Sequence, residues 1–186
     1  MNEKKSIISA VKTEAIELIK TIGTSMVIAF VTVNFLIRPI RVEGSSMYPT
    51  LESDALGIAN VLSVRMHDLN RFDIAIIYIE EEQKYLVKRI IGLPGETVAY
   101  RSGTLYINGE AVEENFLDTE YRSSYSGVFM ADVDEITLGE DEYYCLGDNR
   151  PNSKDSRFYG PFDRSQIRCK GAVILYPFAD FGVKSW

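Results

Sequence analysis

The stretch Tyr-Leu-Val-Lys-Arg-Ile-Ile-Gly-Leu-Pro-Gly at residues 85–95 has the period-two pattern of a β-strand. In an extended conformation, Lys88 lies between Leu86 and Ile90 on one face, and Arg89 lies among aliphatic residues on the other. An edge strand can hold cations in solvent, but this strand cannot expose both faces without exposing its aliphatic side chains. We therefore expect Lys88 to be desolvated, which lowers its pKa from the usual value of about 10.4 toward neutrality.

A candidate nucleophile, Ser46, lies in Gly-Ser-Ser-Met-Tyr-Pro-Thr at residues 44–50. Clusters of glycine, serine and proline usually form plain loops, so Ser46 qualifies only if a base can take its proton. The one histidine, His67, lies in the polar segment 65–70 without apolar periodicity, which is typical of a solvated loop histidine. An uncharged Lys88 is the stronger candidate for the base.

Four blocks of the sequence together resemble type I signal peptidases, the Ser/Lys membrane proteases that remove signal peptides from exported proteins. The blocks are Ser-Met-Tyr-Pro-Thr at 46–50, Arg-Phe-Asp-Ile-Ala at 71–75, Lys-Arg-Ile-Ile-Gly-Leu-Pro-Gly at 88–95 and Gly-Asp-Asn-Arg-Pro-Asn-Ser-Lys-Asp-Ser-Arg at 147–157. They occur in the family's order and, with the apolar segment before them, span nearly the whole chain. The resemblance, to the short form of Gram-positive bacteria, implies a mainly β fold: a single transmembrane helix followed by an antiparallel β-sheet catalytic domain.

The resemblance assigns the reaction to a Ser/Lys pair without cofactor or metal. Ser46 would attack the scissile carbonyl to form an acyl-enzyme, and neutral Lys88 would act as the general base. The Ser46 backbone N–H is the implied oxyanion donor. Some family members add a hydroxyl from the residue two positions earlier, but this chain has Gly44 there. Ser45 and a further backbone donor are the alternatives for the second oxyanion contact.

Residues 147–157 are dense in polar side chains, and by themselves they would indicate a solvent-exposed turn cluster. The resemblance instead implies supporting roles at the active site. Ser153 would hydrogen-bond and orient Lys88, Asp155 and Arg157 would pair to hold the loop, and Asp148 would support the local fold. A lysine base needs such support, because its several rotatable bonds would otherwise rarely direct it at the nucleophile.

By resemblance, the substrates are exported preproteins that bind as an added β-strand and carry small residues, typically alanine, at the first and third positions before the cut. Met47 and the aliphatic residues near Lys88 are candidate walls of shallow apolar pockets, with positions in the core as the alternative. The sequence departs from the family at Phe72, where the block commonly reads Arg-Gly-Asp. This change lies outside the predicted Ser/Lys pair.

The N-terminal part has the pattern of a membrane anchor. Residues 1–20 mix lysines and apolar residues at roughly helical spacing, which predicts a helical segment at the membrane surface. No residue from 21 to 37 is charged, and as a helix this run would extend about 26 Å, close to the thickness of the hydrocarbon core. A buried soluble helix is the alternative. A cleavable signal peptide is disfavoured, because Arg-Pro-Ile-Arg at 38–41 occupies the place of a small-residue cleavage site.

Three segments follow from this interpretation. Residues 1–20 form a cytoplasmic or interfacial segment, 21–37 a transmembrane signal anchor, and 38–186 an extracytoplasmic catalytic β domain. The lysines before the anchor favour a cytoplasmic N-terminus, which predicts a single-pass protein of the cell membrane. Ser46 would then lie at the bilayer surface, where the end of a substrate's own membrane segment arrives.

Several further strands are predicted beyond the anchor. Residues 74–79 form a continuous β-prone run suited to a strand buried on both faces. The Asn-Gly pair at 108–109 predicts a hairpin with a type I′ turn. The acidic segment 113–141 reads as an irregular excursion, and residues 142–146 and 172–176 as strands.

The two cysteines, Cys145 and Cys169, lie in strand-like contexts. A disulfide is conceivable on an oxidising side of a membrane, but two unpaired cysteines, with Cys145 buried, are the preferred prediction. A cysteine protease would need Cys145 paired with His67. Neither residue lies in a recognisable catalytic context, so this alternative ranks low.

Composition narrows the remaining classes. The net charge of −7 argues against a nucleic-acid partner, which needs a basic face. The predicted partners of a peptidase are exported preproteins and the lipid bilayer. Two other functional classes are alternatives to the peptidase. A membrane-anchored β scaffold would not need Ser46 together with Lys88. A soluble self-cleaving regulator of the repressor type would need a DNA-binding domain where this chain has its anchor.

Overall fold

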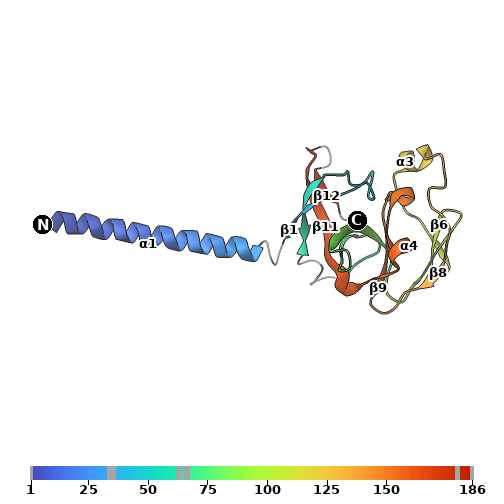
Figure 1. The fold of residues 1–186 in the computed structure, drawn as a ribbon, viewed down its shortest axis with the longest axis horizontal. Coiled ribbons are helices and arrows are strands. Elements are labelled where there is room, and N and C mark those ends of the chain that lie inside the picture. The colour runs from blue at the N-terminus through green and yellow to red at the C-terminus, as the bar shows by residue number, and fades with distance from the viewer. Residues whose placement is uncertain (1, 33–36, 62–63, 65–67, 179–180, 185–186) are drawn as a thin grey trace. The chain divides into compact units, whose positions relative to one another are not determined.

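The structure is a computed structural model that describes residues 2–32, 37–61, 64, 68–178 and 181–184 (Figure 1). The chain divides into two compact units, Met1–Ile37 and Arg38–Trp186. We describe each unit by itself.

The first unit is one helix, α1 (Asn2–Val31). It runs through the boundary at residue 20 that separated the two predicted segments. Thr21 and Thr24 turn their hydroxyls back to the carbonyls of Glu17 and Lys20, so these polar side chains are satisfied within the helix. Within the described residues no helix has both the length and the apolar content of a membrane span. Residues 33–36 of the predicted anchor 21–37 lie outside the described residues.

The second unit contains two antiparallel sheets. Within the described residues the larger sheet has eight strands in the order β1-β2-β11-β3-β4-β9-β10, with β12 also paired to β11. Its strands are β1 (Ile37–Arg41), β2 (Leu56–Asn60), β3 (Ile74–Ile79), β4 (Lys84–Gly92), β9 (Glu142–Leu146), β10 (Phe162–Asp163), β11 (Ile167–Tyr176) and β12 (Gly182–Lys184). The mainly β, antiparallel character is therefore confirmed. The strand predicted at 172–176 is the second half of β11, which is longer because it pairs with β3, β2 and β12.

The smaller sheet lies toward the opposite end of this unit from β1 and β12 (Figure 1). Its order is β7-β6-β5-β8, formed by β5 (Thr97–Arg101), β6 (Thr104–Ile107), β7 (Glu110–Val112) and β8 (Val133–Thr137). The predicted hairpin between β6 and β7 is confirmed, with positive φ angles of 51° at Asn108 and 81° at Gly109 as a type I′ turn requires.

The segment 113–141, predicted as irregular, contains regular structure. It forms the short helix α3 (Thr119–Ser124) as well as β8. Strand β8 was not predicted because its acidic residues obscure the apolar pattern. Only Val133 and Ile136 pack toward the core, and the two positions between them are exposed. Further short helices are η2 (Arg150–Asn152), α4 (Ser156–Tyr159) and η3 (Arg164–Gln166).

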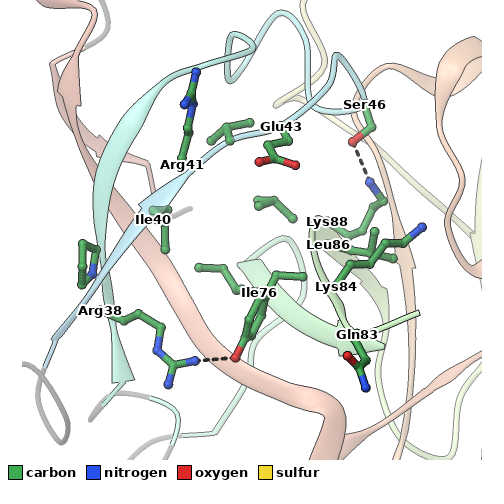
Figure 2. A pocket seen from close by; sticks show the side chains of 14 residues that line it. Arg38, Ile40, Arg41, Glu43, Ser46, Ile76, Gln83, Lys84, Leu86 and Lys88 are labelled. Atoms are coloured by element: carbon green, nitrogen blue, oxygen red, sulfur yellow. Dashed lines mark hydrogen bonds between the residues drawn. The ribbon is translucent and has the colours of Figure 1, made fainter. Parts of the chain in front are cut away.

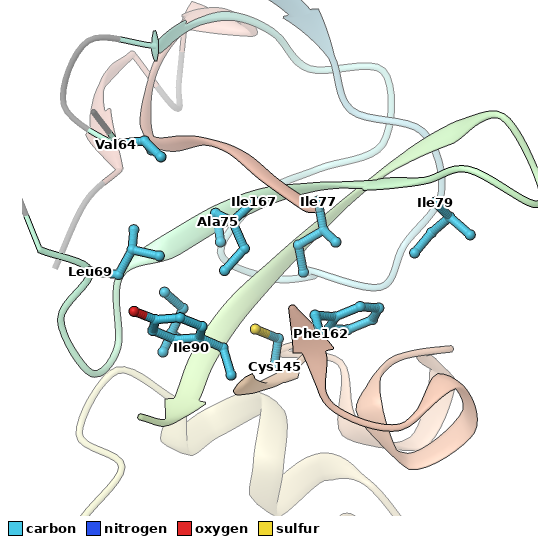
Figure 3. Packing of buried hydrophobic residues seen from close by; sticks show 10 residues of the cluster. Val64, Leu69, Ala75, Ile77, Ile79, Ile90, Cys145, Phe162 and Ile167 are labelled. Carbon is cyan, nitrogen blue, oxygen red and sulfur yellow. The ribbon is translucent and has the colours of Figure 1, made fainter. Parts of the chain in front are cut away.

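The second half of strand β4, from Lys88 to Gly92, is buried on both faces as its sequence predicts, whereas Tyr85 near the start of the strand is exposed. Ile90 lies in the core between β3, β9 and β11, and Leu86 packs against the same core (Figure 3). Ile91 lies in a second core, which the smaller sheet covers. The alternative that Lys88 and Arg89 are solvated cations is wrong, because their side chains are only 2% and 0% exposed. Cys145 and Cys169 are both free and buried, as predicted.

Candidate active site

Ser46 lies on a tight turn between β1 and β2. Gly44 has φ = +82°, a left-handed conformation that favours glycine, and Tyr48 N donates to Ser45 O at 3.1 Å. Met47 lies in the core, in a cluster with Val42, Leu51, Ala55, Ile74 and Ile174. Of the two alternatives for Met47, pocket wall or core, the structure supports the core: its side chain holds the turn from the interior, while Ser46 beside it stays partly accessible.

Lys88 reaches Ser46 from the middle of β4. Lys88 Nζ donates to Ser46 Oγ at 2.6 Å (Figure 2). Burial lowers the pKa of Lys88 from its ordinary value of 10.5 to about 8, against the opposing attraction of the Asp155 and Asp148 carboxylates. The predicted desolvation of this lysine is thus present, and the amine lies within proton-transfer distance of the predicted nucleophile.

The polar block 147–157 closes on the Ser46 turn. Asn149 N donates to Ser46 O at 3.0 Å, and Asn149 Nδ2 donates to Ser45 O at 2.9 Å. Asn152 Nδ2 donates to Ser45 Oγ at 2.9 Å. Neither asparagine is among the predicted site residues. Both lie in the block 147–157, and this was the only feature of the sequence that could have indicated them. The block therefore holds the turn of the nucleophile through hydrogen bonds and is not merely a solvated turn cluster.

Gly147 allows this close approach. A Cβ atom at this position would lie 2.3 Å from both Ser46 O and Ser153 Oγ, a distance that real Cβ contacts do not reach. Any side chain here would push the block away from the nucleophile's turn.

Asp148 joins the two reacting segments through one buried carboxylate. Arg89, the neighbour of Lys88, donates to it through Nε at 2.8 Å and Nη2 at 2.6 Å. Thr50, on the Ser46 turn, donates through Oγ1 to Asp148 Oδ2 at 2.6 Å. The Arg89 guanidinium also stacks 4.2 Å from the centroid of the Phe116 ring. Asp148 has the predicted supporting position. Thr50 belongs to the sequence block 46–50, but its contact with Asp148 was not predicted.

Asp155 and Arg157 form the predicted ion pair. Arg157 donates to the Asp155 carboxylate through Nε at 2.8 Å and Nη2 at 2.7 Å. Gly147 N also donates to Asp155, at 3.1 Å. Burial by itself would raise the pKa of Asp155, but the Arg157 guanidinium and the Gly147 N–H outweigh it and lower the pKa. The carboxylate therefore stays ionised beside Lys88.

Ser153 is half-buried at the site, and the predicted hydrogen bond to Lys88 is not formed. Its Oγ atom is buried and makes no hydrogen bond of standard geometry with the described residues, although the hydroxyl helps to lower the pKa of Asp155. Lys88 Nζ points at Ser46 instead, and Ser153 packs against Gly147. Its predicted role in orienting the lysine stays a prediction.

A groove of about 520 Å³ extends from the Ser46–Lys88 pair (Figure 2). One wall comes from β1 and the residues after it, and the other from the start of β4, with Ile76 of β3 between them. Its lining residues are Arg38, Pro39, Ile40, Arg41, Val42, Glu43, Ser46, Ile76, Gln83, Lys84, Tyr85, Leu86, Val87 and Lys88. An extended peptide in this groove would bring a carbonyl to Ser46.

The cysteine-protease alternative gains no support. Cys145 is fully buried, and this burial raises the pKa of its thiol far from the reactive thiolate range. The predicted solvated histidine, His67, lies outside the described residues. Phe72 occupies a left-handed position with φ = +73°, which accounts for the glycine usual in the block. Packing of its ring 4.8 Å from the Phe116 ring holds phenylalanine in this conformation.

Comparison with known proteins agrees with this geometry. The family model described as "Signal peptidase, peptidase S26" matches residues 15–176. Signal peptidase IB of Staphylococcus aureus (strain Mu50) is 32% identical over 180 residues, covering 91% of this chain and 94% of the relative. Signal peptidase I S of Bacillus subtilis (strain 168) is 34% identical over 171 residues, covering 90% and 92%.

A solved structure of the same family is similar to part of this chain. The crystal structure of a signal peptidase I from Enterococcus faecalis V583 is 37% identical, with a TM-score of 0.51, and covers 55% of this chain and 96% of its own. A family match over most of the chain, together with relatives above 30% identity over nine-tenths of it, shows that the chain belongs to the signal peptidase family, peptidase S26.

Proposed function

We propose that this chain is a membrane-anchored signal peptidase I that cleaves exported preproteins with Ser46 as nucleophile and Lys88 as general base. The observation that carries the proposal is the 2.6 Å contact between Lys88 Nζ and Ser46 Oγ, made by a lysine whose pKa burial lowers to about 8. The family supplies the reaction class, a serine endopeptidase acting on signal peptides.

Acylation begins with neutral Lys88. The amine takes the Ser46 proton as Oγ attacks the scissile carbonyl, and the resulting ammonium then protonates the leaving amine as the peptide bond breaks. A pKa of about 8 suits both steps, because Lys88 can be deprotonated near neutral pH and still return the proton. In deacylation, neutral Lys88 takes a proton from a water that attacks the Ser46 ester, and the acyl part of the substrate leaves as a carboxylic acid.

The oxyanion of each tetrahedral intermediate needs donors that are already in place. The Ser46 backbone N–H makes no hydrogen bond to another described residue, so it is available as one donor. Asn149 and Asn152 hold the turn from the other side and fix the direction of this N–H. The Ser45 hydroxyl accepts from Asn152 Nδ2, which helps to hold the turn, and its own proton is still free to donate to an oxyanion. Ser45 and a further backbone N–H therefore both stay candidates for the second donor.

Substrate binding by strand addition is supported by the edge of β4. Residues 84–88 pair with β3 on one side, whereas β9 pairs only with positions 89, 90 and 92. Among the described residues, no strand covers the other edge of 84–88, so it can accept an extended peptide. Ile40 and Val87 pack around Ile76 under the groove, which suits small apolar side chains such as the alanines of an Ala-x-Ala site.

Anchoring in the cell membrane rests on the sequence. Lysines precede the uncharged run 21–37, and this pattern supports a single-pass topology with a cytoplasmic N-terminus and the catalytic unit on the outer face. Such an anchor would deliver Ser46 to the bilayer surface, beside the end of a preprotein's signal peptide.

Cleavage by purified variants tests the proposal. The full-length enzyme in detergent is incubated with a preprotein that carries an Ala-x-Ala site. Ser46→Ala and Lys88→Ala should each abolish cleavage, and Lys88→Arg should do the same because a guanidinium does not give up its proton near neutral pH. Ser126→Ala, an exposed serine far from the turn in sequence, is the matched control and should cleave normally. Full activity of any dyad variant would rule out the Ser46–Lys88 mechanism.

A further inference from the structure

Side-chain contacts connect the two walls of the groove beside the Ser46–Lys88 pair at both of its ends. At one end is the contact between Lys88 Nζ and Ser46 Oγ at 2.6 Å. At the other end, Arg38 Nη1 of β1 donates to the hydroxyl of Tyr85 on β4 at 2.7 Å, and the guanidinium lies 5.5 Å from the Tyr85 ring centroid (Figure 2). The groove is thus bounded lengthwise by two contacts between the same two walls.

These walls are not neighbours in the sheet. Three strands, β2, β11 and β3, separate β1 from β4. At about 4.8 Å per strand, a flat sheet would hold β1 and β4 about 19 Å apart. The sheet therefore curls to bring Arg38 to Tyr85, and their contact helps to set how far apart the groove walls stand.

We propose that Arg38 and Tyr85 form a clamp that positions the substrate by fixing the groove to the width of one extended strand. This inference rests on the proposed function and deepens it, since it names residues outside the Ser46–Lys88 pair that govern binding. Neither side chain touches the reacting atoms, so both are positioning residues and act on affinity for the peptide.

The spacing along β4 predicts which part of the substrate meets the clamp. Tyr85 lies three residues before Lys88, about 10 Å away along a strand at about 3.3 Å per residue. A peptide paired with this edge, with its scissile carbonyl at Ser46 and its residue at the cut level with Lys88, would bring its fourth residue before the cut to the clamp. Residues closer to the cut would lie between the two ends of the groove.

The other cations of the groove are held in different ways. Arg41, also on β1, pairs with Asp54 at 2.7 Å, on its own side of the groove. Lys84, beside Tyr85, pairs with Glu82. The Tyr85 ring is supported by Tyr78, with ring centroids 4.8 Å apart. Apart from Lys88 at the catalytic end, Arg38 is therefore the groove cation among the described residues whose side-chain hydrogen bond crosses from one wall to the other.

The expected effect is moderate and falls on KM. Arg38 is exposed and Tyr85 is about half exposed, so loss of their hydrogen bond should raise KM about 3- to 10-fold. The value of kcat should stay within about twofold, because the Ser46–Lys88 contact at the other end remains. The pH profile of kcat should not move.

The test uses full-length enzyme in detergent with two synthetic peptides that share an Ala-x-Ala site, one starting three residues before the cut and one starting five residues before it. Arg38→Gln and Tyr85→Phe should each raise KM for the longer peptide, and the double variant should be little worse than either alone, because both remove one contact. Neither variant should change KM for the shorter peptide, which does not reach the clamp. Arg101→Gln, which removes the same charge from an arginine that stacks 5.5 Å from the Tyr106 ring centroid on the smaller sheet and does not line the groove, is the matched control.

An unchanged KM for the longer peptide in both single variants would overturn the clamp. So would an equal rise for both peptides, or an equal rise in Arg101→Gln. A fall in kcat with a displaced pH profile would also overturn it, since that result would place Arg38 and Tyr85 in the chemistry. Failure of the wild-type enzyme to cleave either peptide, or activity in Ser46→Ala, would instead count against the proposed function itself.

Discussion

Replacing Lys88 with methionine should stabilise the protein at neutral pH while it abolishes cleavage. Burial lowers the pKa of Lys88 from 10.5 to about 8, and this difference, at about 1.4 kcal/mol per pKa unit, corresponds to about 3 kcal/mol of folding free energy lost at pH 7. Methionine has nearly the same length and no charge to desolvate. Loss of the hydrogen bond to Ser46 costs about 1 kcal/mol of stability, so we expect the free energy of unfolding to rise by about 2 kcal/mol.

The pH dependence identifies the cause of this gain. Between pH 8 and 10.5, the unfolded chain binds a proton at Lys88 that the folded protein does not hold, so the wild-type protein gains stability as the pH rises. The advantage of Lys88→Met should therefore be full below pH 8 and shrink above it. Denaturant unfolding of both full-length proteins in detergent at pH 7 and pH 9.5 measures the difference.

A matched control comes from the same strand. Lys84 is partly exposed, and its pKa is raised by its hydrogen bond to Glu82. Lys84→Met should not stabilise the protein at pH 7. A Lys88→Met protein that is less stable than wild type at pH 7, or whose advantage is the same at both pH values, would refute the claim that burial lowers the pKa of this lysine.

Two other substitutions test the surroundings of the pair. Thr50→Val should lower the free energy of unfolding by about 1–2 kcal/mol and reduce kcat, because it removes the Thr50 hydrogen bond to buried Asp148; Thr50→Ser should restore both, and a Thr50→Val enzyme with wild-type stability and kcat would contradict this role. Gly44→Ala and Gly44→Ser should both lose about 1 kcal/mol of stability to the left-handed backbone at φ = +82°. Gly44→Ser should have a kcat at least about tenfold above Gly44→Ala, because its hydroxyl adds an oxyanion donor, and equal kcat values would show that position 44 does not face the oxyanion.

The chemical environment of the site was largely predictable from the sequence. Alternation along β4 was enough to place Lys88 and Arg89 in the interior, because aliphatic neighbours on both faces left the strand no exposed side. The Asn-Gly turn at 108–109 was likewise a local signal, since both residues tolerate the positive φ that the turn demands.

Features that depend on contacts between distant segments were not predictable in this way. Strand order and the pairing of β4 with β9 are set by packing between segments far apart in sequence, which no local period encodes. The same applies to Thr50 and Asn152, whose side chains are ordinary turn formers until Asp148 and Ser45 are brought to them. Met47 was ambiguous because an apolar residue beside a nucleophile suits a pocket or a core equally well.

The central claim is that a desolvated, uncharged Lys88 activates Ser46, and the pH dependence of kcat/KM tests it most directly. The measurement follows cleavage of an Ala-x-Ala preprotein by the full-length enzyme from pH 6 to pH 10. With a Lys88 pKa of about 8, kcat/KM should rise about tenfold per pH unit below pH 7.5 and level off above pH 9. A profile that is flat across this range, or one that is still rising at pH 10 as an ordinary solvated lysine would require, would contradict the account.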